Sequence, residues 1–556
     1  MLFSKELLLP YLVQFNPGTN TFFGYSEFLT ALAVMVIAWS ISDIRYKFRV
    51  FTANISIIQI SFSMTFIIGF MTLLTELWKE KKWLVLNINL IDYQIWQFGF
   101  ALLLILIIFL WSWFAFIKPS KFGLMNAKRY TENLYFHILN GTPENLVVLA
   151  SELNRSAFNI IKYAPIYQRH MPEKNNTKIS KVSEFSNQIL WMIADKRFCK
   201  VIASNSPSTI YAFFDAINQQ KKYKISISIF AKNIIDAASN DTNSFIYHET
   251  EGYDSGFLGF QKPISTVLFS NFSMIEEVGT FLEVDYNKRE NWTDENWKAY
   301  SRIALAAFES YCNNGKFYHS RAIYIALENI GKSTYNLYEY DKKENFDKKI
   351  SYNNLYIAIN FIKETFRIIE SSNVDLSKYP LRKHEINYHE TIFDQIAELI
   401  FDIILNASSV TSPQWTCWHI QHNSVWARIF DHLGNKTKAE KIIKFKVRRM
   451  IYNEIKKMNQ FPNFKGARLL AFSLNILGFS DKKSQKESYP LHKAVRSWIK
   501  KNYSWLVLNE PSVASACLVD GIIFDQKSRN IIQLPMPHVL HSGSPKVILN
   551  VDPLEN

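Results

Sequence analysis

Thiol, imidazole and indole side chains gather in one short stretch of the chain, between Trp415 and His432. Within it, Cys417, His419 and His422 supply the sulfur and nitrogen ligands that a soft metal ion takes in proteins. A structural zinc site needs four ligands, and no fourth one can be named here. Because Trp and Cys are also among the residues most often found in interiors, we predict a buried aromatic turn with neither a metal nor a cofactor.

Two further segments imitate known motifs without the geometry that the chemistry needs. Residues Ala326–Ser333 match a loose phosphate-loop pattern, but the segment has the periodicity of a helix that ends near Gly331. Residues 384–390 contain two histidines and two glutamates, as in a zinc-protease helix. His384 and His389 are five positions apart, however, so on a helix they would point about 140° apart. We expect no enzymatic site in either segment.

The densest positive charge lies between Lys436 and Lys457, where nine lysines and arginines stand against two glutamates. A helix over this stretch has one apolar side, so we expect the basic residues on its outer face. Such a face either stays solvated or binds anionic lipid or nucleic acid through phosphate contacts. The residues singled out for that binding are Lys441, Lys444, Arg448 and Arg449.

Polar side chains also interrupt an apolar stretch near the N-terminus, and Asn54, Gln59 and Ser63 represent this polar face. Bare lipid cannot satisfy such groups. They therefore bond to neighbouring helices or a sister subunit, as these residue types do in membranes, or they line a water-filled path in an oligomer. No ionisable residue lies inside the apolar stretches, which argues against a proton-coupled transporter.

The elements that would hold these residues begin with a membrane module of about three spans. Two charge-free stretches exceed the ~20 residues that cross a bilayer, and a shorter apolar one, which could instead lie in the interface, precedes them. The spans are predicted at residues 25–42, 51–75 and 94–117. Lys and Arg follow the first and third spans, and the positive-inside rule places both segments in the cytoplasm. We predict a multi-pass plasma-membrane protein whose large C-terminal part is cytoplasmic.

The rest of the chain is basic and has mainly helical periodicity. About +13 of the net charge of +14 falls on residues 118–556, which favours an anionic neighbour. Apolar residues recur at three and four positions, for example from Leu355 to Ile369, without a fixed repeat length. A solenoid-like array and an irregular bundle therefore both stay open. Alternating residues from Lys224 to Ile229 suit one short strand, although so few residues also fit a helix.

Breaks rich in Pro, Asn, Ser and charge set the predicted domain boundaries. The predicted parts are an interfacial or extracytoplasmic segment (1–24), the membrane module (25–117), two parts of a cytoplasmic helical domain (118–370 and 371–530) and an extended, proline-containing tail (531–556).

Three functional hypotheses follow from this organisation. The first is a membrane-anchored sensor or scaffold whose cytoplasmic helical domain binds a partner. The second is an oligomeric, channel-like membrane effector gated by that domain, for example in bacterial defence or stress. The third is a membrane-tethered enzyme whose site is scattered over several helices. The expected partners are the lipid bilayer, a sister subunit or another protein, and either anionic lipid or nucleic acid.

Overall fold

Helices account for most of the computed structural model, so the predicted mainly α class is confirmed. The structure describes residues 12–14, 23–40, 43–86, 93–166, 180–251, 263–315, 317–343, 350–372, 379, 390–431, 437–480, 487–535 and 547–553. Residue contacts divide the chain into two compact units, unit 1 (Met1–Asn233) and unit 2 (Ile234–Asn556). This division differs from the predicted boundary after residue 370.

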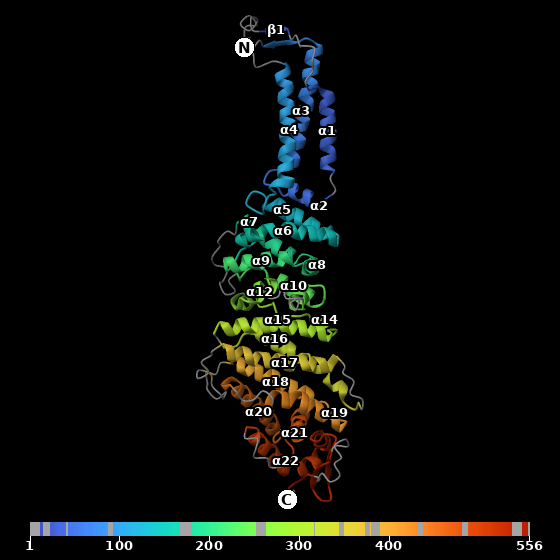
Figure 1. Ribbon diagram of the computed structural model, residues 1–556, viewed down its shortest axis with the longest axis vertical. Helices are drawn as coiled ribbons and strands as arrows, with labels where there is room; N and C mark the ends of the chain where they lie inside the picture. The colour runs from blue at the N-terminus through green and yellow to red at the C-terminus, as the bar shows by residue number, and fades with distance from the viewer. Residues whose placement is uncertain are drawn as a thin grey trace. The chain divides into compact units, whose positions relative to one another are not determined.

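Unit 1 contains a two-stranded sheet and ten helical segments among its described residues, the last of which runs past the division (Figure 1). They are β1 (Leu12–Gln14), α1 (Tyr25–Trp39), α2 (Ile44–Phe51), α3 (Ile57–Glu80), β2 (Leu84–Leu86), α4 (Tyr93–Ser112) with its π-helical continuation η2 (Trp113–Ile117), α5 (Ala127–Asn140), α6 (Pro143–Tyr163), α7 (Lys181–Met192), α8 (Lys196–Asn205), α9 (Pro207–Gln220) and α10 (Ser228–Ser239).

Unit 2 is built mainly from helices that pack on neighbours one or two positions away in the chain. Its elements are α11 (Phe245–Glu251), α12 (Pro263–Phe269), α13 (Phe272–Val278), α14 (Tyr286–Arg289), α15 (Asp294–Asn313), α16 (Arg321–Lys332), the 3₁₀-helix η4 (Tyr335–Tyr340), α17 (Ile350–Ser371), α18 (Ile392–Ala407), α19 (Gln414–Trp418), the π-helix η6 (His419–Asp431), α20 (Lys438–Lys457), α21 (Phe464–Leu477), α22 (Tyr489–Asn509), α23 (Pro511–Ala516), β3 (Ile522–Asp525), β4 (Asn530–Gln533) and β5 (Val547–Asn550).

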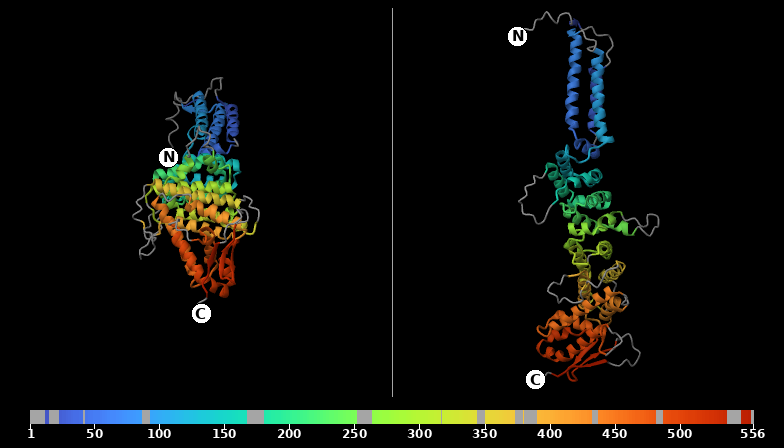
Figure 2. Two further views of the ribbon diagram at one scale, coloured as in Figure 1. Left: turned by 60° about the horizontal axis from the view of Figure 1, so that its bottom comes forward. Right: turned by 90° about the vertical axis from the view of Figure 1, so that its left-hand side faces the viewer.

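Helices α1, α3 and α4 run side by side in unit 1 (Figure 2). Phe28, Met35, Ile68 and Leu104 belong to the buried cluster between them. Gly69 lets α1 approach α3 closely, because a Cβ atom there would lie 2.6 Å from the ring of Phe28. A larger side chain at this position would require the buried ring of Phe28 to move, and small residues are common where helices pack this closely.

Two of these helices, over residues 57–80 and 94–117, are long and apolar enough to cross a membrane. The third, α1, has 15 residues, so it extends about 22 Å, which is less than the ~30 Å of a hydrocarbon core. The structure therefore has two helices of spanning length and a shorter apolar helix, which matches the prediction of two long stretches preceded by a shorter one.

Side chains satisfy the free backbone N–H groups at the start of α1. The N–H of Tyr25 donates to Glu76 Oε1 at 2.7 Å, and that of Phe23 donates to Gln97 Oε1 at 3.3 Å. These bonds reach the last turn of α3 and the first turns of α4. Because the N–H groups that open a helix have no partner within it, the bonds fix α1 to both neighbours.

The predicted strand at residues 224–229 is wrong. These residues form turns and the first two positions of α10, and both Ile225 and Ile227 are buried. The alternation over six residues arises because a turn buries two of the side chains. In the described part of unit 1, no strand lies beside these residues to pair with them. The short period was therefore insufficient to identify a strand.

The described part of the predicted extended tail contributes to an antiparallel sheet with the order β3-β4-β5. Ile531 of β4 pairs with Leu549 of β5, and both side chains are buried. Pro535 and Pro553 follow the two strands rather than interrupting them, as expected for a residue without an N–H donor. The other prolines of the tail, at 537 and 545, lie outside the described residues.

Candidate functional site

Arg49 of α2 connects the end of α4 to the helix α6. Its Nε and Nη2 atoms donate to the two carboxylate oxygens of Glu152 at 3.0 and 2.6 Å, and its Nη1 donates to the carbonyl oxygen of Ala115 at 3.0 Å. The side chains of Arg49 and Glu152 are 12% and 6% exposed. A bidentate, charge-assisted pair in such an environment is strong and geometrically specific.

The local helix geometry explains why Arg49 reaches this place. Ala115 lies in η2, where α4 ends, and the last carbonyl groups of a helix have no partner within it. A cation is favourable at the negative end of a helix dipole. Arg49 therefore donates to a carbonyl group at the end of α4 that has no partner within the helix. Its other edge bonds to Glu152 of α6.

A second set of bonds joins α5 to the connection between α2 and α3. Arg129 donates to the carbonyl oxygen of Asn54 at 2.8 Å and to Ser56 Oγ at 2.7 Å, and Asn126 Nδ2 donates to the carbonyl oxygen of Thr52 at 2.6 Å. We call these bonds, together with the Arg49–Glu152–Ala115 contacts, the junction. It links the beginning of α3 and the end of α4 to α5 and α6.

The structure does not bring the three predicted polar-face residues together in one buried face. Asn54 lies before α3, and its main chain belongs to the junction. Gln59 and Ser63 are exposed on the outside of the helix bundle, whereas Ser61 and Thr65 point inward and are buried. Periodicity could have separated the two sets, because positions 61, 65, 68, 69 and 72 recur at helical spacing.

The expected outer basic face of α20 is present only in part. Lys438, Lys441, Arg449, Lys456 and Lys457 are exposed, whereas Lys444, Lys446 and Arg448 are largely buried. Lys444 is 0% exposed and lies 3.8 Å from Glu440. Arg448 is largely buried and pairs with Glu487 at 3.1 Å. Of the four predicted binding residues, Lys441 and Arg449 are exposed. The apolar face of α20 is broader than expected because long side chains bury their stems while their charges are paired.

Arg448 and Arg449 line a cleft of about 820 Å³ between α18, α20 and the start of α22. Phe445 and Tyr452 also line it, and its opposite wall carries the carboxylate of Glu398. This carboxylate places a negatively charged group opposite the two arginines of the cleft.

Asp402 follows this wall along α18, and burial together with the neighbouring Glu398 raises its pKa to about 6. A carboxyl whose pKa is raised in the folded state destabilises that state at high pH. The cost grows from about pH 4, where the carboxyl of the unfolded chain ionises, to about pH 6, and stays constant above that. We expect Asp402→Asn to stabilise unit 2 by about 1 kcal/mol at pH 7.5, allowing for partial exposure. Thermal unfolding should show this advantage disappearing below pH 4. An equal advantage at pH 4 would contradict it.

The segment predicted as a buried aromatic turn is helical, in α19 and η6, and its first ring, Trp415, is 43% exposed. Cys417 is buried and accepts a hydrogen bond from Asn475 Nδ2 at 3.4 Å, and burial raises the pKa of its thiol. The rings of Trp418 and His422 stack with centroids 4.6 Å apart. Among the described residues no group of three or more His, Cys, Asp or Glu side chains is placed to hold a metal. A protonated thiol is a poor metal ligand.

The structure describes the phosphate-loop-like segment but not the two histidines of the protease-like segment. Residues 326–332 belong to α16, and Ser333 caps its end, which agrees with the helical reading of the phosphate-loop pattern. His384 and His389 lie outside the described residues. Glu390, which follows them, is described, and its carboxylate lies 3.3 Å from His319 Nδ1.

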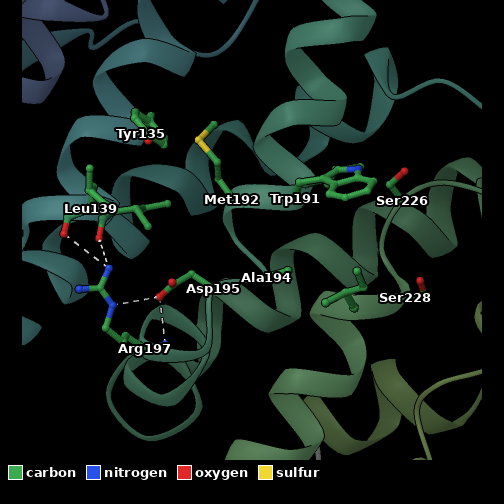
Figure 3. A pocket seen from close by; sticks show the side chains of 12 residues that line it. Tyr135, Leu139, Trp191, Met192, Ala194, Asp195, Arg197, Ser226 and Ser228 are labelled. Carbon is green, nitrogen blue, oxygen red and sulfur yellow. Dashed lines mark hydrogen bonds and ion pairs between the residues drawn. The ribbon is translucent and has the colours of Figure 1, made fainter.

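An open groove of about 390 Å³ lies on unit 1 (Figure 3). Tyr135, Leu139 and Trp191 contribute exposed apolar surface to it. At one end, Arg197 pairs with Asp195 and donates to the carbonyl oxygen of Ile138 at 3.0 Å. The polar groups at this end of the groove thus bond to residues of its own walls, since Arg197 caps the end of α5.

Comparison with known proteins gives no further assignment. No family model matches the chain, and a search of the curated proteins finds no match.

Proposed function

We propose that this protein is a membrane-anchored sensor or scaffold. In this proposal α3 and α4 cross the plasma membrane with α1 beside them, and the helices that follow face the cytoplasm and bind a protein partner. The observation that carries the proposal is the junction, in which side chains of α2 and α5 bond directly to the ends of both long apolar helices.

The surface of the two long helices supports their insertion in a bilayer. Only 33% and 28% of their most apolar windows are buried, whereas the core helix of a soluble protein is buried on most sides. Large side chains such as Phe62, Phe66 and Ile105 are exposed on the described part of the bundle. An apolar surface of this extent is stable in lipid and unfavourable in water.

The junction supports signal transmission rather than simple tethering. A flexible linker would let the anchor and the helical domain move independently. Here Glu152 on α6 and the carbonyl of Ala115 on η2 share the guanidinium of Arg49. A shift of α6 on binding a partner would therefore displace the end of α4, which is the kind of contiguous contact through which coupling travels.

Hydrogen exchange of the full-length protein in nanodiscs tests this coupling. Glu152→Gln should speed amide exchange in α6 and also at residues 113–118, because the guanidinium that bridges them loses its charged partner. Glu132→Gln, which alters an exposed pair on α5, serves as the matched control and should change neither segment. Faster exchange confined to α6 would contradict transmission through the junction.

An oligomeric, channel-like effector is the second candidate, and the exposure of Ser63 favours it. A polar side chain on the outer surface of a spanning helix is more stable against a sister subunit than against lipid. Oxidation of a Ser63→Cys variant in membranes should then give disulfide-linked dimers, with Phe109→Cys on α4 as the comparison. If both variants stay monomeric, no sister subunit lies against this face. The sensor or scaffold proposal then stands without an oligomer there, and the oligomeric effector is contradicted at this face. The four native cysteines are all buried and do not interfere.

A further inference from the structure

Arg289, the last residue of α14 in unit 2, is a buried cation that forms no ion pair within the described part of the chain. Its side chain is 8% exposed, and no carboxylate of the described residues forms an ion pair with it. Other acidic side chains of unit 2 have other partners, since Glu328 pairs with Lys332, Asp236 pairs with Lys288 and Glu290 hydrogen-bonds to Tyr286. Buried charges in folded proteins are normally paired.

Neutral groups hold the guanidinium of Arg289 in place. Its Nη1 donates to Asn329 Oδ1 on α16. The amide of Asn329 is fixed in turn, because its Nδ2 donates to the hydroxyl of Tyr300 at 2.9 Å and to the carbonyl oxygen of Leu282 at 3.2 Å. The guanidinium also lies over the ring of Tyr286, 5.3 Å from its centroid. This arrangement orients the arginine before any ligand arrives, which lowers the cost of binding.

One edge of this guanidinium remains open. Nε and Nη2 hydrogen-bond to no described residue, and neither atom is sealed from solvent. Two parallel N–H groups on one edge match the oxygens of a phosphate or a carboxylate. The open edge therefore has the donor geometry for an oxyanion and no competing acceptor among the described residues.

An exposed aromatic ring lies beside the guanidinium. Tyr286 is 61% exposed, and its ring centroid lies 5.3 Å from the guanidinium carbon. The hydrogen bond and charge of Glu290 raise the pKa of Tyr286. One face of Tyr286 is directed at Arg289, and the other can stack on a planar ring.

We propose that Arg289 is the anion-binding residue of a site for a small organic phosphate that carries a planar ring. Arg289 holds the phosphate through Nε and Nη2, and Tyr286 stacks on the ring. Asn329 is a positioning residue, since it touches the guanidinium and not the ligand. This site lies wholly in unit 2, and its test is independent of the junction.

Binding of adenosine 5′-monophosphate, adenosine and inorganic phosphate to the full-length protein in detergent tests the proposal. Calorimetry should show the monophosphate binding at least tenfold more tightly than adenosine, because only it supplies the oxyanion. Arg289→Gln should weaken its binding at least tenfold, and Tyr286→Ala several-fold. Tyr338→Ala, which removes an exposed ring of η4, is the matched control and should bind normally.

The outcomes separate the two parts of the site. No binding of the monophosphate at millimolar concentration, or equal binding of it and adenosine, would overturn the proposal. If Arg289→Gln does not fold, the exposed Tyr286→Ala variant still decides, because unchanged binding there would overturn the stacking role. Competition by inorganic phosphate would support the oxyanion contact.

Discussion

Methionine in place of Arg49 is expected to lower the free energy of unfolding of unit 1 by about 3 kcal/mol. The substitution keeps most of the apolar stem but leaves the carboxylate of Glu152 buried without its cation, and it releases the carbonyl oxygen of Ala115. Removing one member of a buried pair costs more than the pair contributes, because the remaining charge has lost its water as well. Unfolding in mixed micelles, followed by tryptophan fluorescence, measures the change.

Two further variants show whether the buried charge is the cause. Arg49→Met combined with Glu152→Leu should recover much of the loss, since an apolar pair of similar volume often replaces a buried ion pair without cost. Lys128→Met breaks an exposed pair with Glu132 and should change stability by less than about 0.5 kcal/mol. A single Arg49 variant as stable as the wild type would show that the junction is not a stabilising contact.

Alanine in place of Asp394 is expected to destabilise unit 2 by about 4 kcal/mol, from the loss of a buried pair and of a helix cap. Asp394 accepts hydrogen bonds from the N–H and the hydroxyl of Thr391 at 3.1 and 2.7 Å, which begin α18. Its other oxygen accepts from Lys446 at 2.7 Å, and both charged side chains are buried. Chemical denaturation of the solubilised protein measures the loss.

The comparison of Asp394→Asn with Asp394→Ala separates the two contributions. Asparagine can still accept from the N–H of Thr391, so it should retain the cap and lose the ion pair. Glu364→Gln, in an exposed pair with Arg367 on α17, is the control and should be near neutral. Equal stability of Asp394→Ala and the wild type would contradict a structural role for the cations of α20.

The helices could be predicted from the sequence because their apolar residues repeat at helical spacing over many positions. The same information predicted that the phosphate-loop pattern at residues 326–333 is a helix, and α16 covers it through Lys332. Long charge-free stretches likewise predicted α3 and α4. Six alternating residues at 224–229 were too few, because a turn that buries Ile225 and Ile227 gives the same pattern.

The candidate sites could not be predicted, because their partners are far apart in the chain. Arg49 and Glu152 are separated by about a hundred positions. In the sequence, Arg49 is only one of the positive charges that follow the first predicted span. Lys444 and Lys446 belong to the basic face that the sequence predicts to be exposed. In the structure both side chains are buried and lie close to acidic partners. Arg289 had no distinguishing neighbour in sequence. Its significance is that it forms no ion pair with any carboxylate of the described structure, which no spacing rule can show.

In the proposed arrangement the long apolar helices cross a membrane and leave the helical domain on the cytoplasmic side. Single cysteines at Lys81, after α3, and at Lys128, on α5, test it most directly, because both positions are exposed and the four native cysteines are buried. Cells that express each variant are treated with a membrane-impermeant maleimide before and after permeabilisation. We predict that Lys81→Cys reacts in intact cells and that Lys128→Cys reacts only after permeabilisation. Labelling of both positions in intact cells, or of neither until the membrane is opened, would contradict the membrane-spanning account.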